Sequence, residues 1–111
     1  MTNILTTQIE RNTSHTIFLE PNVDMTGWDF IYLAKHNLAD KDVDAVIPIT
    51  PTFSIVNDVK QVEVKFAPSQ TKNLNVGFLH HSLRAISPDK QTVIVLFNGT
   101  LEITQNGIEA P

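Results

Sequence analysis

Hydrophobic and polar residues alternate with a period of two along most of the chain, and this pattern predicts β-strands. In residues 61–66, Val62, Val64 and Phe66 alternate with polar side chains, which is typical of a strand with one buried face. Residues 27–36 are rich in aromatic and β-branched side chains, so they predict a central strand with both faces covered. Further strands are predicted over residues 4–9, 16–20, 52–56 and 74–86.

The end of the sandwich is predicted to be a hairpin about Asn98 and Gly99, because both residues tolerate the positive φ of a two-residue type I′ turn. That turn fixes the register and sorts the apolar side chains onto two faces. The set expected to face the core is Ile94, Leu96, Leu101 and Ile103. The set expected on the outer face is Val93, Val95 and Phe97. Either another segment of the chain or a partner protein covers this outer set, which is our candidate interface.

One helical turn is predicted near residues 68–74, since Pro68 suits the first turn of a helix and Gly77 lies just beyond. Many short strands with one helical turn predict an all-β fold, a β-sandwich. We expect residues 1–14 to form an N-terminal arm or edge strand, residues 15–105 the sandwich, and residues 106–111 a loose C-terminal tail.

The adjacent histidines in residues 74–86 are predicted to point to opposite sides of one strand. His81 shares a face with Leu79, Leu83 and Ala85, so we expect a buried, hydrogen-bonded, neutral imidazole. His80 falls on the outer face. The two rings cannot converge on one ligand, and we predict no metal site here.

Composition narrows the classes of protein to which the chain can belong. Its 111 residues suit one domain, and a net charge of −4 without a lysine and arginine cluster argues against nucleic-acid binding. There is no cysteine, no signal-peptide pattern, and no apolar run longer than residues 93–97. We therefore expect a protein made in the cytoplasm, without membrane insertion.

Residues 40–46 imitate the opening of a calcium loop, with aspartates at alternate positions. Ala45 and Pro51 stand where such a loop needs glycine and glutamate, so a solvated acidic loop is favoured over a bound cation. No motif places a nucleophile beside a base, and we predict no catalytic residue, no cofactor and no enzymatic activity.

Aromatic residues at alternate positions offer another kind of site. Trp28, Phe30 and Tyr32 share one strand face, where they could stack on a sugar or simply fill the core.

Four stretches, taken in order, resemble the small immunoglobulin-like domain of tailed-phage structural proteins, notably the N-terminal domain of baseplate upper proteins and tail-fibre attachment domains. They are the turn and strand of residues 24–36, the strand and helical turn of 64–74, the strand of 74–83, and the end of the chain at 97–104. Leu79 and His81 stand where that family prefers tyrosines, and Ser82 where it prefers aspartate.

The resemblance implies an immunoglobulin-like antiparallel β-sandwich that is not an enzyme. It implies binding to other virion structural proteins, with a homotrimer as one expected state, and location in the virion. We expect a tail, baseplate or fibre adaptor. The alternatives are a capsid decoration protein of the head and a small carbohydrate-binding module, because fold alone does not choose among functions.

Overall fold

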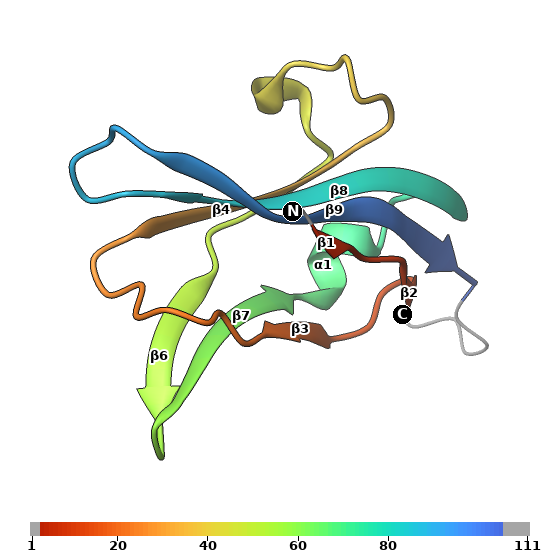
Figure 1. Ribbon diagram of the computed structural model, residues 1–111. Helices are drawn as coiled ribbons and strands as arrows, with labels where there is room; N and C mark the ends of the chain where they lie inside the picture. The colour runs from red at the N-terminus through yellow and green to blue at the C-terminus, as the bar shows by residue number, and fades with distance from the viewer. Residues whose placement is uncertain (1–2, 106–111) are drawn as a thin grey trace.

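Two β-sheets face each other in the computed structural model, which describes residues 3–105 (Figure 1). Sheet A is six-stranded and contains β1 (Asn3–Ile4), β2 (Thr7–Glu10), β4 (Asp29–Lys35), β5 (Ile47–Ile49), β8 (Gly77–Ile86) and β9 (Val93–Thr104). Sheet B is three-stranded and contains β3 (His15–Leu19), β6 (Thr52–Val56) and β7 (Val59–Phe66). The tail predicted over residues 106–111 lies outside the described residues.

The strand order confirms an all-β, immunoglobulin-like sandwich. Sheet A runs β1-β9-β8-β4-β5, with β2 also pairing β9, and sheet B runs β3-β7-β6. Most pairs are antiparallel, but β1 and β2 both run parallel to β9. The N-terminal segment is therefore an edge of sheet A that pairs with the last strand of the chain.

Side chains from both sheets meet in one core. Sheet A contributes Tyr32, Leu83 and Leu101, and sheet B contributes Val62 and Val64, all of them buried. The alternation predicted for residues 61–66 of β7 is confirmed, because Val62, Val64 and Phe66 are buried and the polar residues between them are not. Burial of such side chains is the main favourable term in folding.

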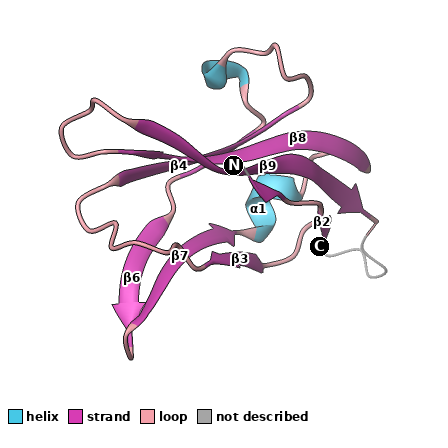
Figure 2. Cartoon of the chain, viewed as in Figure 1, coloured by secondary structure: helices cyan, strands magenta, loops and turns pink. Residues whose placement is uncertain are grey.

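Helical structure is confined to two short segments of the described residues (Figure 2). The predicted turn is α1 (Pro68–Thr71), where the Gln70 side chain accepts a hydrogen bond from the backbone N–H of Ala67 at 2.8 Å. A 3-10 turn, η1 (Asp42–Asp44), lies in the loop of residues 36–46. In residues 3–105 no helix has the length and apolar character needed to cross a membrane.

The predicted hairpin about Asn98 and Gly99 is wrong, because β9 continues through both residues as one strand. Asn98 pairs with Ser82 and Gly99 with His81. The backbone of Leu5 crosses directly over Gly99, where an added Cβ would stand 2.1 Å from the Leu5 carbonyl oxygen. This glycine permits a close approach of two backbones instead of forming a turn.

A β-bulge changes which residues of β9 face the core. Leu83 pairs with Phe97 whereas Arg84 pairs with Val95, so Leu96 is an extra residue without a partner on β8. The extra residue reverses the alternation on its N-terminal side. Val93 and Val95 therefore face outward, whereas Phe97, on the C-terminal side of the bulge, shares the inner face with Leu101 and Ile103. Phe97 is 1% exposed, which corrects its predicted place on the outer face.

The rest of the β9 prediction has a mixed outcome. Leu101 and Ile103 are buried as expected, and Leu96 is only partly buried against the core. Ile94 pairs with buried Ala85 on the inner face but is 39% exposed, so its predicted place in the core is wrong.

Candidate functional site

The outer face of sheet A carries aliphatic side chains close together at the end where β4 begins. Two neighbouring cross-strand rows over β4, β8 and β9 are Ile31–Arg84–Val95 and Asp29–Ile86–Val93. We call the four aliphatic residues the outer patch: Ile31, Ile86, Val93 and Val95.

The outer patch is open to solvent and held by the most extensively paired strands of the fold. Val93 is 59% exposed and Ile31 38%, while Ile86 and Val95 are half-buried. The predicted outward direction of Val93 and Val95 is confirmed, and their role as an interface stays a prediction. Ile31 corrects the expectation that both faces of β4 are covered.

Ion pairs border the outer patch. Arg84 donates to Asp42 at 3.0 Å, and Lys35 donates to the same carboxylate at 2.7 Å from the foot of the loop of residues 36–46. The hydrogen bond from Lys35 is the main reason why the pKa of Asp42 lies below its usual range. Lys90 pairs with Asp29 on the other border. Charges of both signs thus frame the apolar side chains, as at the rim of many protein interfaces.

His81 lies on the opposite, inner face and is 2% exposed, as predicted. Its Nε2 is 2.8 Å from the Leu5 carbonyl oxygen, which can only accept, so Nε2 carries the proton. Its Nδ1 is then an acceptor and receives the hydroxyl proton of Tyr32 at 2.8 Å. Burial raises the pKa of Tyr32 and lowers that of His81, so both groups are neutral. The pair is structural: it fastens the N-terminal segment to the core.

Stability should fall as the pH drops through the ordinary pKa of histidine. Burial lowers the pKa of His81 below its usual 6.5, so the unfolded chain binds the proton more readily than the folded chain. We expect a constant free energy of unfolding above about pH 7.5 and a decline below about pH 6.5. Urea titrations at several pH values measure it. His81→Gln should flatten the decline, whereas His80→Gln, at an exposed position, should not. An equal decline in both variants would contradict the assignment.

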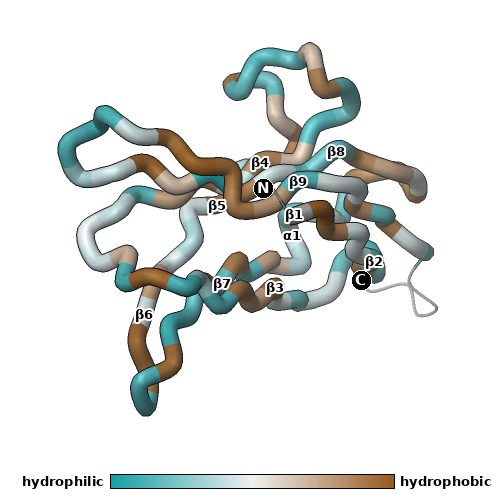
Figure 3. The backbone as a smooth tube through the Cα atoms, viewed as in Figure 1, coloured by the Kyte–Doolittle hydropathy of each residue, from teal (hydrophilic) through white to brown (hydrophobic). Residues whose placement is uncertain are grey.

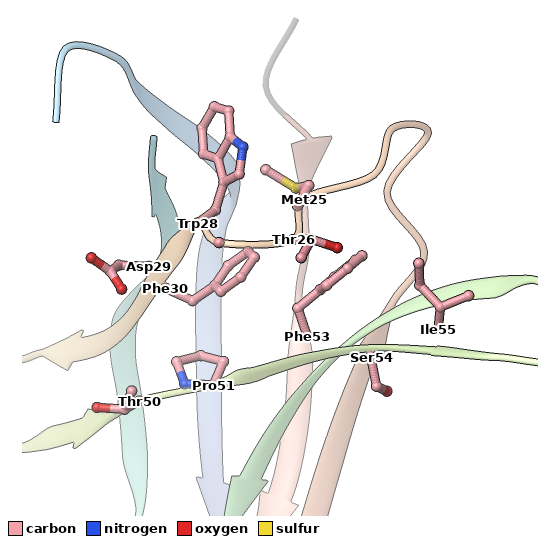
Figure 4. Close-up of a pocket in the computed structure, with 11 residues that line it drawn as sticks. Met25, Thr26, Trp28, Asp29, Phe30, Thr50, Pro51, Phe53, Ser54 and Ile55 are labelled. Atoms are coloured by element: carbon pink, nitrogen blue, oxygen red, sulfur yellow. The ribbon is translucent and has the colours of Figure 1, made fainter. Parts of the chain in front are cut away.

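A pocket of about 410 Å³ opens at the same end of the sandwich, between the sheets (Figure 4). Its wall includes Trp28 and Phe30 on one side and Pro51, Phe53 and Ile55 on the other. The rings of Phe30 and Phe53 stack at 6.2 Å between centroids. We call it the aromatic pocket.

Two of the three aromatic side chains proposed as a sugar-stacking platform are buried. Phe30 and Tyr32 are buried, and Tyr32 is 0% exposed, so neither presents a ring face to a sugar. Trp28 is partly buried against the core. The core interpretation of this aromatic series is therefore the correct one for Phe30 and Tyr32.

The acidic loop offers no cation site among the described residues. Asp42 is engaged by Lys35 and Arg84, while the Asp40 side chain accepts from the backbone of Asn37 at 3.2 Å. Within residues 3–105 no group of three or more histidine, aspartate or glutamate side chains is placed to hold a metal ion.

Comparison with known proteins supports the fold but no family. No family model and no curated protein matches the sequence. A solved structure similar to this one is the cysteine protease inhibitor EhICP2 from Entamoeba histolytica, with a TM-score of 0.52 and 18% identity. The match covers 92% of this chain and 88% of that one. The neighbour is named as an inhibitor, not an enzyme, and at this identity it shows a shared fold.

Sequence reasoning missed part of both surfaces. Ile31 and Ile86 join the outer patch only because β4 and β8 are neighbours, which the order of strands along the chain does not reveal. The aromatic pocket combines residues from segments 25–30 and 50–55. The aromatic residues themselves were visible in the sequence, but their meeting place depended on the packing of the sheets.

Proposed function

We propose that the chain is a structural protein of a tailed-phage virion, a tail, baseplate or fibre adaptor that binds other virion proteins and catalyses no reaction. The observation that carries this proposal is the outer patch. Four aliphatic side chains lie together on a rigid face, in contact with solvent, with ion pairs around them. The core does not need them there, and contiguous exposed apolar surface is characteristic of protein-binding sites.

The order of motifs in the sequence supports the phage assignment. The resembling turn before β4 is built by Asp24, whose carboxylate accepts from the backbone and the hydroxyl of Thr26 at 2.9 and 2.5 Å. The resembling helical turn carries Thr71, which is buried and accepts the backbone N–H of Asn12 at 2.9 Å. The side chains of Asp24 and Thr71 stabilise connections between strands of the sandwich. This gives a physical reason for the motifs to occur together.

Mass spectrometry of purified particles tests this proposal. Virions produced by a host that carries the gene should contain the chain in a fixed ratio to the tail proteins. A fixed ratio to the capsid protein would support the decoration alternative instead. Absence from the particles, with the chain present in the lysate, would overturn the proposal. Light scattering on the pure chain tests the expected homotrimer, whose mass would be three times 12.4 kDa.

A charge in the outer patch should weaken assembly and spare folding. Val95 is half-buried on the outer face, so Val95→Asp places a carboxylate beside Arg84, where water and a cation are within reach. We expect a stability change within about 1 kcal/mol and a loss of incorporation into particles. Val95→Thr, with nearly the same shape, should lose less. Normal incorporation of Val95→Asp would remove the outer patch from the interface.

Protease inhibition is a second candidate function, favoured by the likeness to a cysteine protease inhibitor and by the grouping of three loops. The loops of residues 20–28 and 87–92 lie on the left of Figure 1, and the turn at 57–58 lies at the bottom left. The ion pair of Asp29 with Lys90 joins the start of β4, directly after the first loop, to the loop of residues 87–92. A papain-type protease assay separates the candidates. Stoichiometric inhibition would favour this one, and an unchanged rate would support the structural role.

A further inference from the structure

β6 is the outermost strand of sheet B beside the aromatic pocket, and no strand of the described residues pairs with its far edge. β6 and β7 are joined by Asn57 and Asp58, whose φ angles of 52° and 66° suit a two-residue type I′ turn. In such a hairpin the residues that flank the turn, Val56 and Val59, form a hydrogen-bonded pair. The direction of every other main-chain group on β6 follows by alternation.

Alternation turns two residues of β6 toward the open edge. Ser54 and Thr52 pair with β7 as Val56 does, so their main-chain groups are used inside the hairpin. Phe53 and Ile55 then direct their N–H and C=O groups away from β7, where sheet B has no further strand within residues 3–105. The edge presents a short row of donors and acceptors that another strand can complete.

The sequence of β6 does not protect this edge. Natural edge strands are often guarded by lysine, proline or a bulge. The opposite edge of sheet A has such a guard, since Pro48 stands in the middle of β5 and lacks an N–H. β6 contains neither proline nor charge, and its outer end, Ile55 and Val56, is exposed and hydrophobic (Figure 3).

The aromatic pocket lies on the side of β6 that faces between the sheets. β5 pairs with β4 only as far as Tyr32 and ends at Ile49, so the first half of β4 has no neighbour on that side. Figure 4 shows the side chains of Trp28, Phe30 and Phe53 turned toward this space. A strand added to β6 would direct every second side chain into the pocket.

We propose that the open edge of β6 binds an extended segment of a partner protein as an additional strand of sheet B, with an apolar side chain of that segment in the aromatic pocket. The chain carries a net charge of −4, so charge complementarity favours a basic residue beside the apolar one. Of the residues that form or border the outer patch, only Asp29 also lines the pocket, and the proposal does not depend on the phage assignment.

A second copy of the chain is a poorer occupant than a basic segment. Pairing β6 with β6 of another copy would bring together two chains that each carry a net charge of −4. Like charges at short range oppose that contact.

Selection from a displayed library of random peptides of about eight residues, the length of an ordinary strand, tests the proposal on the whole chain. We expect the selected peptides to alternate apolar and polar residues and to carry lysine or arginine. Hydrogen exchange measured by NMR should show fast amides at Phe53 and Ile55 in the free protein. Binding of the selected peptide should protect both.

Ile55→Pro removes the outward N–H and leaves the pairs with β7 intact, whereas Ile55→Ala keeps that N–H and is the control. We expect about tenfold weaker binding by the proline variant than by the alanine variant, which corresponds to about 1.4 kcal/mol. Equal binding by the two variants, protection elsewhere, or no selected peptide would overturn the proposal. So would a dimer of the free chain that Ile55→Pro dissociates, because the occupant would then be a second copy. If Ile55→Pro fails to fold, the test rests on the unmodified chain: the selected peptide should slow hydrogen exchange at the amides of Phe53 and Ile55, and unchanged exchange there would overturn the proposal.

Discussion

Replacing Phe97 with aspartate is expected to prevent the chain from folding. Phe97 is 1% exposed, and its ring lies 5.1 Å from that of His81 and 6.2 Å from that of Tyr32. An aspartate there would remove a large apolar side chain and leave an unpaired carboxylate in the core. Truncation of a buried phenylalanine alone costs about 3–5 kcal/mol, and a domain has only about 5–15 kcal/mol to lose.

Circular dichroism and urea unfolding of the purified variant measure this effect. Phe97→Ala should remain folded with a free energy of unfolding lower by about 3–5 kcal/mol, while Phe97→Asp should show no cooperative transition. Val95→Asp is the matched control, since Val95 stands only two positions away on the outer face. Similar stability of the two aspartate variants would show that Phe97 and Val95 do not lie on opposite faces of β9.

The position of a strand was predictable wherever one of its faces packs against the core. His81 and His80 separated onto opposite faces as period-two alternation requires, and the burial of His81 followed from its apolar neighbours. The partners of His81 were not predictable. Leu5 is 76 residues away along the chain, and its carbonyl reaches the imidazole only because the N-terminal segment pairs with β9.

The errors in the sequence prediction share one physical cause. Asn98 and Gly99 have the local chemistry of a turn, but long-range pairing with β8 and the crossing of Leu5 impose a straight strand. Leu96 carries no signal for a bulge, and one inserted residue is enough to place Val93 and Val95 on the face opposite to that of Phe97. β5 was not predicted, because it is only three residues long and its central residue is Pro48. Local patterns describe faces well and describe contacts between distant strands poorly.

The candidate site was predictable to the same extent. Alternation from Val93 to Val95 gave half of the outer patch, and the other half depended on which strands lie beside β9. The aromatic pocket is a property of an end of the sandwich where β5 stops and the chain crosses to sheet B. Surfaces of this kind form only when the sheets assemble, so they cannot be predicted from the sequence of a single strand.

Gly99→Ala is expected to release the N-terminal segment from the sandwich. An added Cβ would stand 2.1 Å from the oxygen and 2.8 Å from the carbon of the Leu5 carbonyl, both backbone atoms. Leu5 cannot shift freely, because its N–H donates to the Asn98 carbonyl at 2.7 Å and its carbonyl accepts from His81 at 2.8 Å. Release would expose Ile9 and leave the buried imidazole without an acceptor. These losses amount to about 1.5–3 kcal/mol for the side chain and about 1–3 kcal/mol for the hydrogen bond.

Local methods distinguish release of the segment from general unfolding. Hydrogen exchange should accelerate at Leu5 and Ile9 while the amides of β4 and β8 stay protected, and trypsin should cleave after Arg11 in the variant before it cleaves elsewhere. Gly77→Ala is the matched control: Gly77 has φ of 150° against 155° for Gly99, but an added Cβ there meets nothing within 4 Å. The control therefore carries the backbone strain without the collision. If both variants lose stability equally and keep Ile9 protected, strain and not the crossing of Leu5 accounts for the glycine, and the N-terminal segment is held by its pairing with β9 alone.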